Sequence, residues 1–212
     1  MKKNNLRALS MSAVLGAVGF VLMLLEFPLP FIIPSFIKFD FSELPCIIAT
    51  FTFGPVWGIL SCFIKNLIHL FITSTSGVGE LSNFVLGAAF TGFCGIIYKY
   101  DRTRKGALIS CLIGSLLMAG ISVASNYYLV YPAYEKIFGM PMDVIVGMYK
   151  TILPASDSLI KSLIIFNMPF TFVKGIADSL ICFAVYKRIS PILRNGFGKK
   201  NKKEKKNKQY FT

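Results

Sequence analysis

Three ionisable residues lie inside long apolar stretches of this chain: Lys65, Lys174 and Asp178. A charged side chain within a membrane-spanning helix costs about 2.5–3.5 kcal/mol on insertion scales, so it normally faces a cavity, a partner or the interior of a helix bundle. Lys174 and Asp178 are four residues apart and would share one face of a helix. Two interpretations follow. The pair neutralises itself, with Lys65 as a third member, or Lys174 donates to a ligand carbonyl while Asp178 or a neighbour fixes its charge.

Three asparagines, Asn83, Asn126 and Asn167, are predicted in the outer halves of three different helices. An amide needs partners for both its donor and its acceptor atoms, which would suit the edge of a heterocycle, although asparagine also links helices to one another. Together with Lys174 and Thr171 they indicate a polar pocket that opens outward. Aromatic rings that could form walls for a flat ligand are Phe41, Phe84, Phe166 and Phe170.

The remaining chemistry-bearing residues show no catalytic or metal-binding pattern. His69 is the sole histidine and lacks metal-ligand spacing. No GxxxxGK[ST] sequence is present, so the chain is not expected to hydrolyse ATP by itself. The five cysteines lie singly in apolar runs without a CxxC pair and are expected to be small core residues. We therefore expect no catalytic residue, no metal and no cofactor, and the chain is not expected to be an enzyme.

The elements that would position these residues are membrane helices. The chain has 212 residues, of which 54% are hydrophobic and 16% charged, and its mean hydropathy is +0.62. Residues 8–25, 44–64, 81–98 and 106–134 contain no Asp, Glu, Lys or Arg, and about 20 apolar residues suffice to span a bilayer. This composition excludes an ordinary cytosolic enzyme. It predicts an all-α integral membrane protein.

Six transmembrane helices account for the apolar segments. The stretch 44–73 would be about 45 Å long as one helix, longer than the roughly 30 Å hydrocarbon core, and Gly54-Pro55 divides it. Residues 28–43, 74–79 and 130–159 are expected outside the bilayer. The predicted helices are 6–25, 44–53, 56–72, 80–98, 106–129 and 160–187.

The basic residues predict the orientation. Most of the 23 Lys and Arg residues precede the first helix, fill the connection after residue 98 or lie in the C-terminal tail. Cytoplasmic segments carry such an excess, so both termini are expected in the cytoplasm. The net charge of +13 is thus a topology signal rather than a sign of nucleic-acid binding. We expect a single membrane domain, 1–190, and a basic cytoplasmic tail, 191–212, that can touch anionic lipid.

Several motifs together resemble one family, the substrate-binding S components of energy-coupling factor (ECF) transporters, and most closely its riboflavin-specific members. The resemblance covers residues 8–190, nearly all of the chain but the tails. The motifs are Phe39–Pro45 running into Ala49–Pro55, Val56–Leu67 with Lys65-Asn66, Asn83-Phe84 with Gly87-Ala88, Asn126-Tyr127 with Pro132, Pro169-Phe170, and Val173–Gly175.

The resemblance implies a six-helix protein that binds a vitamin near the outer surface, under the loop between its first two helices. Partners implied are riboflavin as transported ligand, a transmembrane coupling subunit and two ATPase subunits. Polar side chains of the fifth and sixth helices meet the isoalloxazine edge in this family, which matches Asn126 and Lys174. The family's asparagine three residues before the lysine is Thr171 here, and Asn167 could compensate.

The residues expected to bind the ligand are Asn126, Lys174, Thr171, Asn167, Asn83, Phe41 and Leu44. The first helix in the family contacts the coupling subunit through an AxxxA motif, which Ala13 and Ala17 match. Small residues on this helix would also suit packing within the protein.

Three other functions stay open. The Thr171 difference is compatible with another vitamin, such as folate, thiamine, biotin or a queuosine precursor. A stand-alone secondary carrier would show inverted repeats with broken helices at matching positions, whereas the sequence shows a break only at Gly54-Pro55. A membrane enzyme would need a paired His, Asp or Cys constellation, which the sequence lacks.

Overall fold

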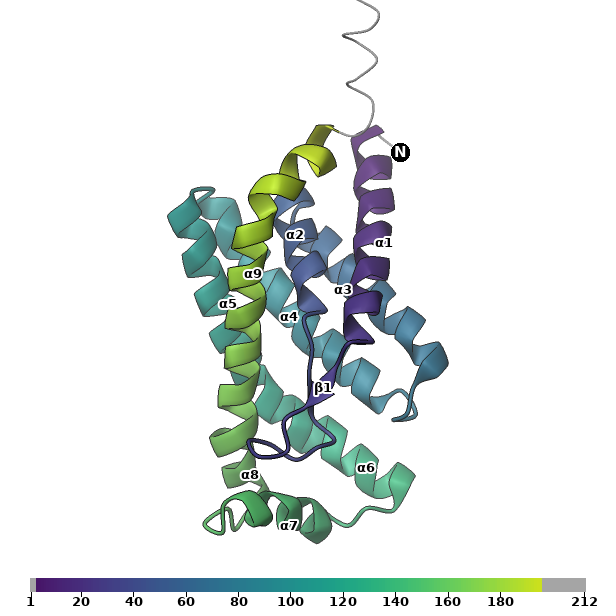
Figure 1. The fold of residues 1–212 in the computed structure, drawn as a ribbon, viewed down its shortest axis with the longest axis vertical. Coiled ribbons are helices and arrows are strands. Elements are labelled where there is room, and N and C mark those ends of the chain that lie inside the picture. Colours follow the sequence, from purple (N-terminus) through teal and green to yellow (C-terminus); the bar gives the residue numbers. More distant parts are fainter. Residues whose placement is uncertain (1–2, 196–212) are drawn as a thin grey trace, which may run out of the picture.

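The computed structural model describes residues 3–195, which form a helical bundle with one short β-hairpin (Figure 1). The elements are α1 (Lys3–Met23), β1 (Phe27–Pro28), β2 (Lys38–Phe39), α2 (Glu43–Phe53), α3 (Pro55–His69), the 3₁₀ turn η1 (Leu70–Ile72), α4 (Val78–Tyr100), α5 (Arg104–Ser125), the π-helical turn η2 (Asn126–Val130), α6 (Tyr131–Phe138), α7 (Met142–Ile152), α8 (Leu159–Ser162), the π-helical turn η3 (Leu163–Asn167) and α9 (Met168–Asn195).

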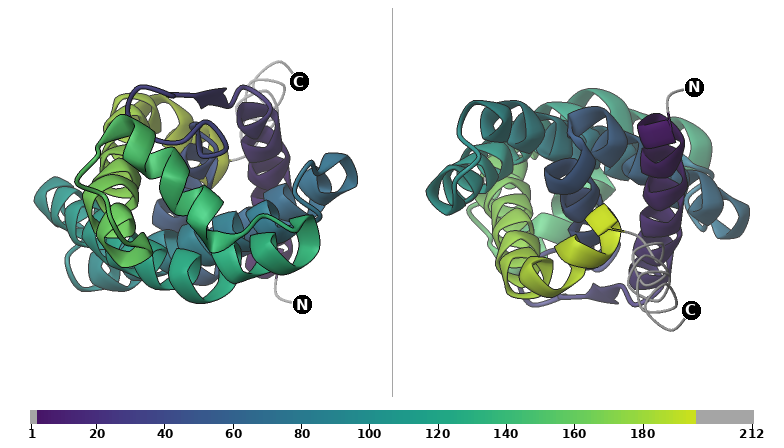
Figure 2. Two further views of the ribbon diagram at one scale, coloured as in Figure 1. Left: turned by 90° about the horizontal axis from the view of Figure 1, so that it is seen from below. Right: turned by 90° about the horizontal axis from the view of Figure 1, so that it is seen from above.

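The long helices surround α2. Figure 1 shows α9 extending along most of the length of the bundle and α1 along the half that holds the N-terminus, and α2 packs against α1, α3, α4 and α9. The start of α1 and the described end of α9 lie at the same end of the bundle, whereas α6, α7 and the hairpin lie at the other (Figures 1 and 2). We call this second end the hairpin end.

Gly54 separates α2 from α3, as the sequence predicts. Its φ of 112° lies in the region that favours glycine. Pro55 follows as the first residue of α3, where its missing N–H leaves no hydrogen bond unmade. The two helices therefore turn back on one another as a hairpin.

Five helices of the described chain are long and apolar enough to cross a membrane, and α2 is a shorter apolar helix of 11 residues. The five segments are Asn5–Met23, Pro55–Ile72, Val78–Tyr100, Arg104–Phe138 and Leu159–Tyr186. Each matches a predicted helix, and α2 matches the sixth. The all-α membrane fold predicted from composition is therefore confirmed.

The largest departure from prediction is at the fifth helix, which was expected to end at residue 129. The structure continues it through η2 into α6, so that helix extends to Phe138. Pro132 follows directly after the π-helical turn η2, where the regular i→i−4 hydrogen bonding of the α-helix is already interrupted. The segment 130–159, which was expected to lie outside the bilayer, contains the helices α6 and α7. Of the predicted tail, 191–212, residues 191–195 belong to the end of α9, and the remainder lies outside the described residues.

Two clusters of buried side chains form the core. The first lies around α2 and includes Ile47, Ile48, Phe90 and Cys111. The second lies at the hairpin end and joins Ile33, from the loop between α1 and α2, to helices η2, α6, α7 and η3. Its buried members are Ile33, Val78, Val130, Tyr131, Tyr134, Ile145, Tyr149 and Leu163.

Candidate functional site

A cavity of about 430 Å³ lies between these two clusters. Its walls come from the loop between α1 and α2 (residues 24–42, the 24–42 loop), from the turn after α3, and from α4, α5, η2, α6, η3 and α9. Helices that are distant in sequence therefore converge on one space.

The polar residues predicted for a ligand pocket line this cavity. Asn83, Asn126, Asn167, Thr171 and Lys174 are all in its wall. Asn126 begins the π-helical turn η2, and Asn167 ends the π-helical turn η3. Such turns are rare and frequently occur at functional sites. Here they place two amides at the cavity.

The amides of Asn126 and Asn167 differ in how far the protein already uses them. Asn126 Nδ2 donates to Ser122 O at 2.8 Å, which leaves its oxygen for a ligand. Asn167 Oδ1 accepts from the hydroxyl of Tyr149 at 2.6 Å, and Asn167 Nδ2 donates to that of Tyr131 at 3.4 Å. Asn167 therefore holds two aromatic side chains in place as well as facing the cavity.

The aromatic walls differ from those predicted. Phe170 lines the cavity, together with Phe36, Tyr131 and Tyr134. Phe41 is not among the lining residues, and its ring packs against Phe39 with centroids 5.3 Å apart. Three further residues singled out from the sequence also lie outside the lining. Leu44 packs on the core around α2, Phe84 packs against Phe63, and Phe166 against Tyr149.

Lys65 is held in a buried ion network below the cavity. Its ammonium donates to Glu43 Oε1 at 2.5 Å, to Ser42 Oγ at 2.6 Å and to Asn83 Oδ1 at 3.3 Å. The Lys65 side chain is fully buried and that of Glu43 nearly so. Lys65 is therefore paired with Glu43, and the interpretation that joined it to Lys174 and Asp178 is wrong. The acid that pairs with Lys65 comes from the start of α2.

The ammonium of Lys174 lies 2.8 Å from Asp40 Oδ2. Asp40 belongs to the 24–42 loop, and its other oxygen accepts from the backbone N–H of Ser42 at 2.7 Å. The intrahelical pair of Lys174 with Asp178 is thus not formed. Asp178 is fully buried, and neither of its oxygens has a hydrogen-bond partner among the described residues.

The charge of Asp40 is stabilised by these lysines. Burial of the Asp40 carboxyl acts to raise its pKa, but the charges of Lys174 and Lys65 and the hydrogen bonds from Lys174 and Ser42 together outweigh it and lower the pKa to about 2. Asp40 is therefore ionised at neutral pH and forms a charged link between the 24–42 loop and α9.

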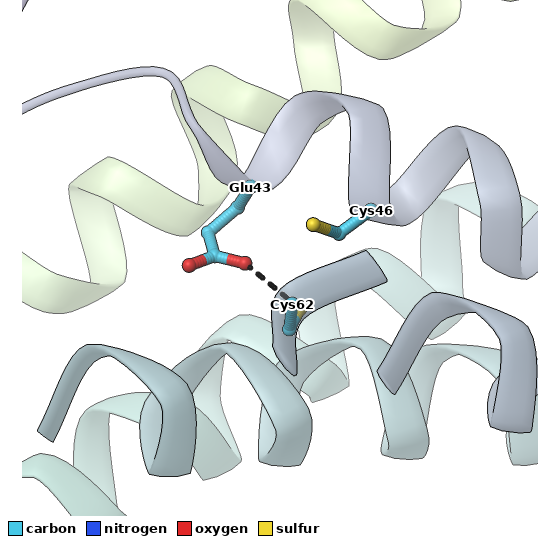
Figure 3. A group of neighbouring side chains, drawn as sticks. All are labelled: Glu43, Cys46 and Cys62. Carbon is cyan, nitrogen blue, oxygen red and sulfur yellow. Dashed lines mark hydrogen bonds between the residues drawn. The ribbon is translucent and has the colours of Figure 1, made fainter. Parts of the chain in front are cut away.

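One group of side chains has the composition of a metal site. The ligand atoms of Glu43, Cys46 and Cys62 lie within 4.8 Å of one another, and all three residues are buried (Figure 3). However, Lys65 already supplies a cation to Glu43, and the Cys62 thiol lies 3.4 Å from Glu43 Oε2 as a donor. This group is therefore better explained as part of the ion network than as a metal centre.

A second polar group faces the cavity at the turn after α3. His69 Nδ1 lies 2.8 Å from Glu80 Oε1, and Glu80 Oε2 accepts from Thr73 and Thr75 at 2.9 and 3.0 Å. Sequence reasoning found no carboxylate partner for His69, because Glu80 comes from the next helix.

Sequence reasoning also missed Asp40, Tyr131 and Tyr134 in the cavity wall. Asp40 carried a usable signal, since it is an acid inside the aromatic segment 36–41. The tyrosines did not, because they were predicted to lie beyond the end of a helix that in fact continues.

The small residues of α1 face two directions. Gly16 and Gly19 are buried, and an added Cβ would lie 2.9 Å from Ile64 Cβ and 3.1 Å from Ser42 O. Ala17 is exposed and Ala13 half-buried. The glycines thus permit close packing inside the protein, while the AxxxA alanines lie on or near the outer face of α1.

Comparison with known proteins agrees with this geometry. The family model for "ECF transporter, substrate-specific component" matches residues 7–186. The riboflavin transporter RibU of Staphylococcus aureus (strain TCH60) is 33% identical over 192 residues, which cover 91% of this chain and 94% of that protein. The riboflavin transporter FmnP of Bacillus subtilis (strain 168) is 32% identical over 195 residues, with coverage of 90% and 94%.

The fold is also that of a solved structure described as "Structure and mechanism of the S component of a bacterial ECF transporter". The TM-score is 0.69 at 30% sequence identity, and the match covers 90% of this chain and 99% of the other. A family model that spans most of the chain, relatives matched over nearly their whole length and a shared fold all agree. The chain therefore belongs to the family of substrate-specific S components of ECF transporters.

Proposed function

We propose that this protein is a riboflavin-binding S component that takes up the vitamin through the cell membrane. The observation that carries the proposal is the cavity at the hairpin end, where Asn126, Thr171 and Lys174 meet in a chain one-third identical to named riboflavin transporters. As a member of its family, the chain is a multi-pass protein of the cell membrane.

The chemistry of the cavity suits a flavin. Its volume of about 430 Å³ falls within the roughly 300–1,000 Å³ of small-molecule sites. An isoalloxazine ring is flat and carries carbonyl and imide groups along one edge. Lys174 and Thr171 can donate to the carbonyls, and the free oxygen of Asn126 can accept from the imide N–H. Phe36, Phe170 and Tyr131 would contact the ring faces.

We further propose that α2 acts as a sixth, short span and that both termini face the cytoplasm. The described ends of α1 and α9 lie together at one end of the bundle, and the cavity lies at the other. Basic residues at the α4–α5 connection, Arg102, Arg104 and Lys105, support this orientation. The cavity would then open outward, where the vitamin is captured.

Energy for transport would come from partner subunits. The sequence has no nucleotide-binding loop, so we propose that a transmembrane coupling subunit and two ATPase subunits supply ATP hydrolysis. Ala13 and Ala17 would form the docking face on α1, because small residues let another helix approach closely.

A ligand panel tests the proposal against other vitamins. The flavin-free protein in detergent is heated with riboflavin, folate, thiamine, biotin or a queuosine precursor, and the unfolding temperature is recorded. Riboflavin alone should raise it, since a ligand that binds only the folded state stabilises it by mass action. A rise with another vitamin and none with riboflavin would refute the assignment.

A further inference from the structure

Lys174 lies between two carboxylates, only one of which it contacts. Its ammonium is 2.8 Å from Asp40 in the 24–42 loop. Asp178 lies four residues further along α9, on the same face. It is fully buried, and its two oxygens have no hydrogen-bond partner among the described residues. A buried polar group left unpaired in a native protein calls for an explanation.

The 24–42 loop contributes a long irregular segment to the cavity wall. It contributes Phe36, Ile37, Lys38 and Asp40 to the cavity. Apart from the short β1–β2 pairing it has no regular secondary structure. If the loop lifts to admit a ligand, Asp40 leaves with it. Lys174, which is largely buried, would then lose the one carboxylate it pairs with in the described structure.

Among the charged groups near Lys174, Asp178 is the carboxylate that is available to replace Asp40 as its partner. The charged groups that act on Asp178 are Lys174, Asp40, Glu43 and Lys65. Lys65 and Glu43 are held to each other, and Lys65 also donates to Ser42 and Asn83. Lys174 is therefore the cation that can change partners, and Asp178 is the acid with no bond to give up.

We propose that Asp178 is a positioning residue that takes the ammonium of Lys174 when Asp40 leaves with the loop. The network has two lysines and three carboxylates, so one carboxylate always lacks a cation. With the loop closed this is Asp178, which is fully buried without a hydrogen-bond partner among the described residues and therefore keeps its proton and is neutral. With the loop open it is Asp40, whose charge water can then solvate, while Asp178 releases its proton to water and pairs with the ammonium of Lys174. The exchange lowers the free-energy cost of opening.

The proposal rests on the proposed function only for the identity of the ligand that passes the loop. The exchange between carboxylates involves the protein alone. It can therefore be tested in flavin-free protein, and a failure of flavin binding would leave the result interpretable.

The population of the open loop can be measured with a buried reporter thiol. Ile33 is fully buried in the loop and packs against helices at the hairpin end. In an Ile33→Cys protein a thiol reagent reacts only when the loop lifts, so the labelling rate follows the open population. The five native cysteines are buried, and the protein without Ile33→Cys gives their background rate.

We expect Asp178→Asn to slow labelling about tenfold, because Lys174 then has no carboxylate when the loop opens. Asp40→Asn should accelerate labelling. The matched control is Ser115→Ala, which removes a buried hydroxyl that likewise lacks a partner among the described residues and lies beside Gly175 of α9. It should leave the rate unchanged. Equal rates in Asp178→Asn and Ser115→Ala would overturn the proposal.

A stability cycle gives a second readout. Each single variant, Asp40→Asn or Asp178→Asn, leaves Lys174 one carboxylate, whereas the double variant leaves none. Each variant lowers the folding equilibrium constant by some factor. The factor for the double variant should be about ten times the product of the factors for the two single variants. This excess should vanish in a Lys174→Gln background, and Asp178→Glu should behave as wild type. If, in protein that keeps Lys174, the factor for the double variant equals the product of the two single factors, the proposal is contradicted.

Discussion

Lys174 connects the cavity to the loop beside it. Its ammonium lines the cavity and also pairs with Asp40 of the 24–42 loop. A ligand atom that accepts a hydrogen bond from this ammonium would therefore be bound by Lys174 and would at the same time help to hold the 24–42 loop in place. This dual position makes Lys174 the residue whose replacement should affect flavin binding most.

Lys174→Gln should weaken riboflavin binding by about 1.5–3 kcal/mol, because a hydrogen bond to a charged group contributes about that much. Fluorescence titration measures the change. The control is Lys38→Gln, which removes a partly exposed lysine that lines the cavity and pairs with Glu26. That change should have a small effect. Wild-type affinity in Lys174→Gln would exclude Lys174 from the site.

The Asp40–Lys174 pair also predicts a pH dependence. The pKa of Asp40 is lowered to about 2 in the folded protein, against about 3.9 in an unfolded chain. A lowered folded-state pKa contributes stability that is complete above the unfolded value and is lost as pH falls through the folded one. The wild-type unfolding temperature should therefore exceed that of Asp40→Asn by a constant margin from pH 7 to about 5. The margin should shrink between about pH 4 and 2. A margin that already shrinks between pH 7 and 5 would contradict the assignment.

At the scale of elements, α4 approaches α2 closely at Gly87. A Cβ at this position would lie 2.6 Å from Glu43 Oε2, so the glycine makes room for the carboxylate that Lys65 binds. The sequence motif Gly87-Ala88 thus has a structural reason, which becomes visible only once α2 and α4 are placed together.

Gly87→Val should lower the stability of the protein by several kcal/mol, since it displaces a buried ion pair. Thermal unfolding in detergent measures the loss. Gly120→Ala on α5 is the matched control, because no atom lies within 4 Å of a Cβ built there. Gly120→Ala should be neutral or slightly stabilising. If the two variants were equally stable, the side chain of Glu43 would be able to move aside without cost, and the prediction would be wrong.

A bulky substitution on the outer face of α1 should impair transport and leave flavin binding intact. Ala17→Trp adds a large ring to an exposed position distant from the cavity lining. Flavin affinity should stay at the wild-type level, while uptake in cells that express the partner subunits should fall at least tenfold, since close helix approach needs small residues. Leu116→Trp, at an exposed position of α5, is the control. Loss of flavin binding in Ala17→Trp would instead show that this face of α1 maintains the fold of the binding protein.

At the scale of the whole molecule, the length of the apolar runs was sufficient to predict an all-α membrane bundle. The Gly54-Pro55 break and the bounds of α1, α3 and α4 were predicted within a few residues, because these are local properties. The continuation of the fifth helix through η2 to Phe138 was not predicted, since the prediction ended that helix at residue 129.

The candidate site was predictable in part for the same reason. Asn126, Thr171 and Lys174 could be identified because polar groups are costly in apolar helices. The pairings of Lys174 with Asp40 and of Lys65 with Glu43 could not, since they join residues 134 and 22 positions apart. Local spacing suggested Asp178 as the partner of Lys174, and tertiary structure supplied Asp40.

Riboflavin binding by the purified protein is the central claim, and one titration tests it most directly. The flavin-free protein in detergent is added stepwise to riboflavin, and flavin fluorescence is followed. We predict quenching that saturates at about one equivalent, because a single cavity with aromatic walls holds the ring. Fluorescence that stays unchanged through a large excess of folded protein would contradict the account.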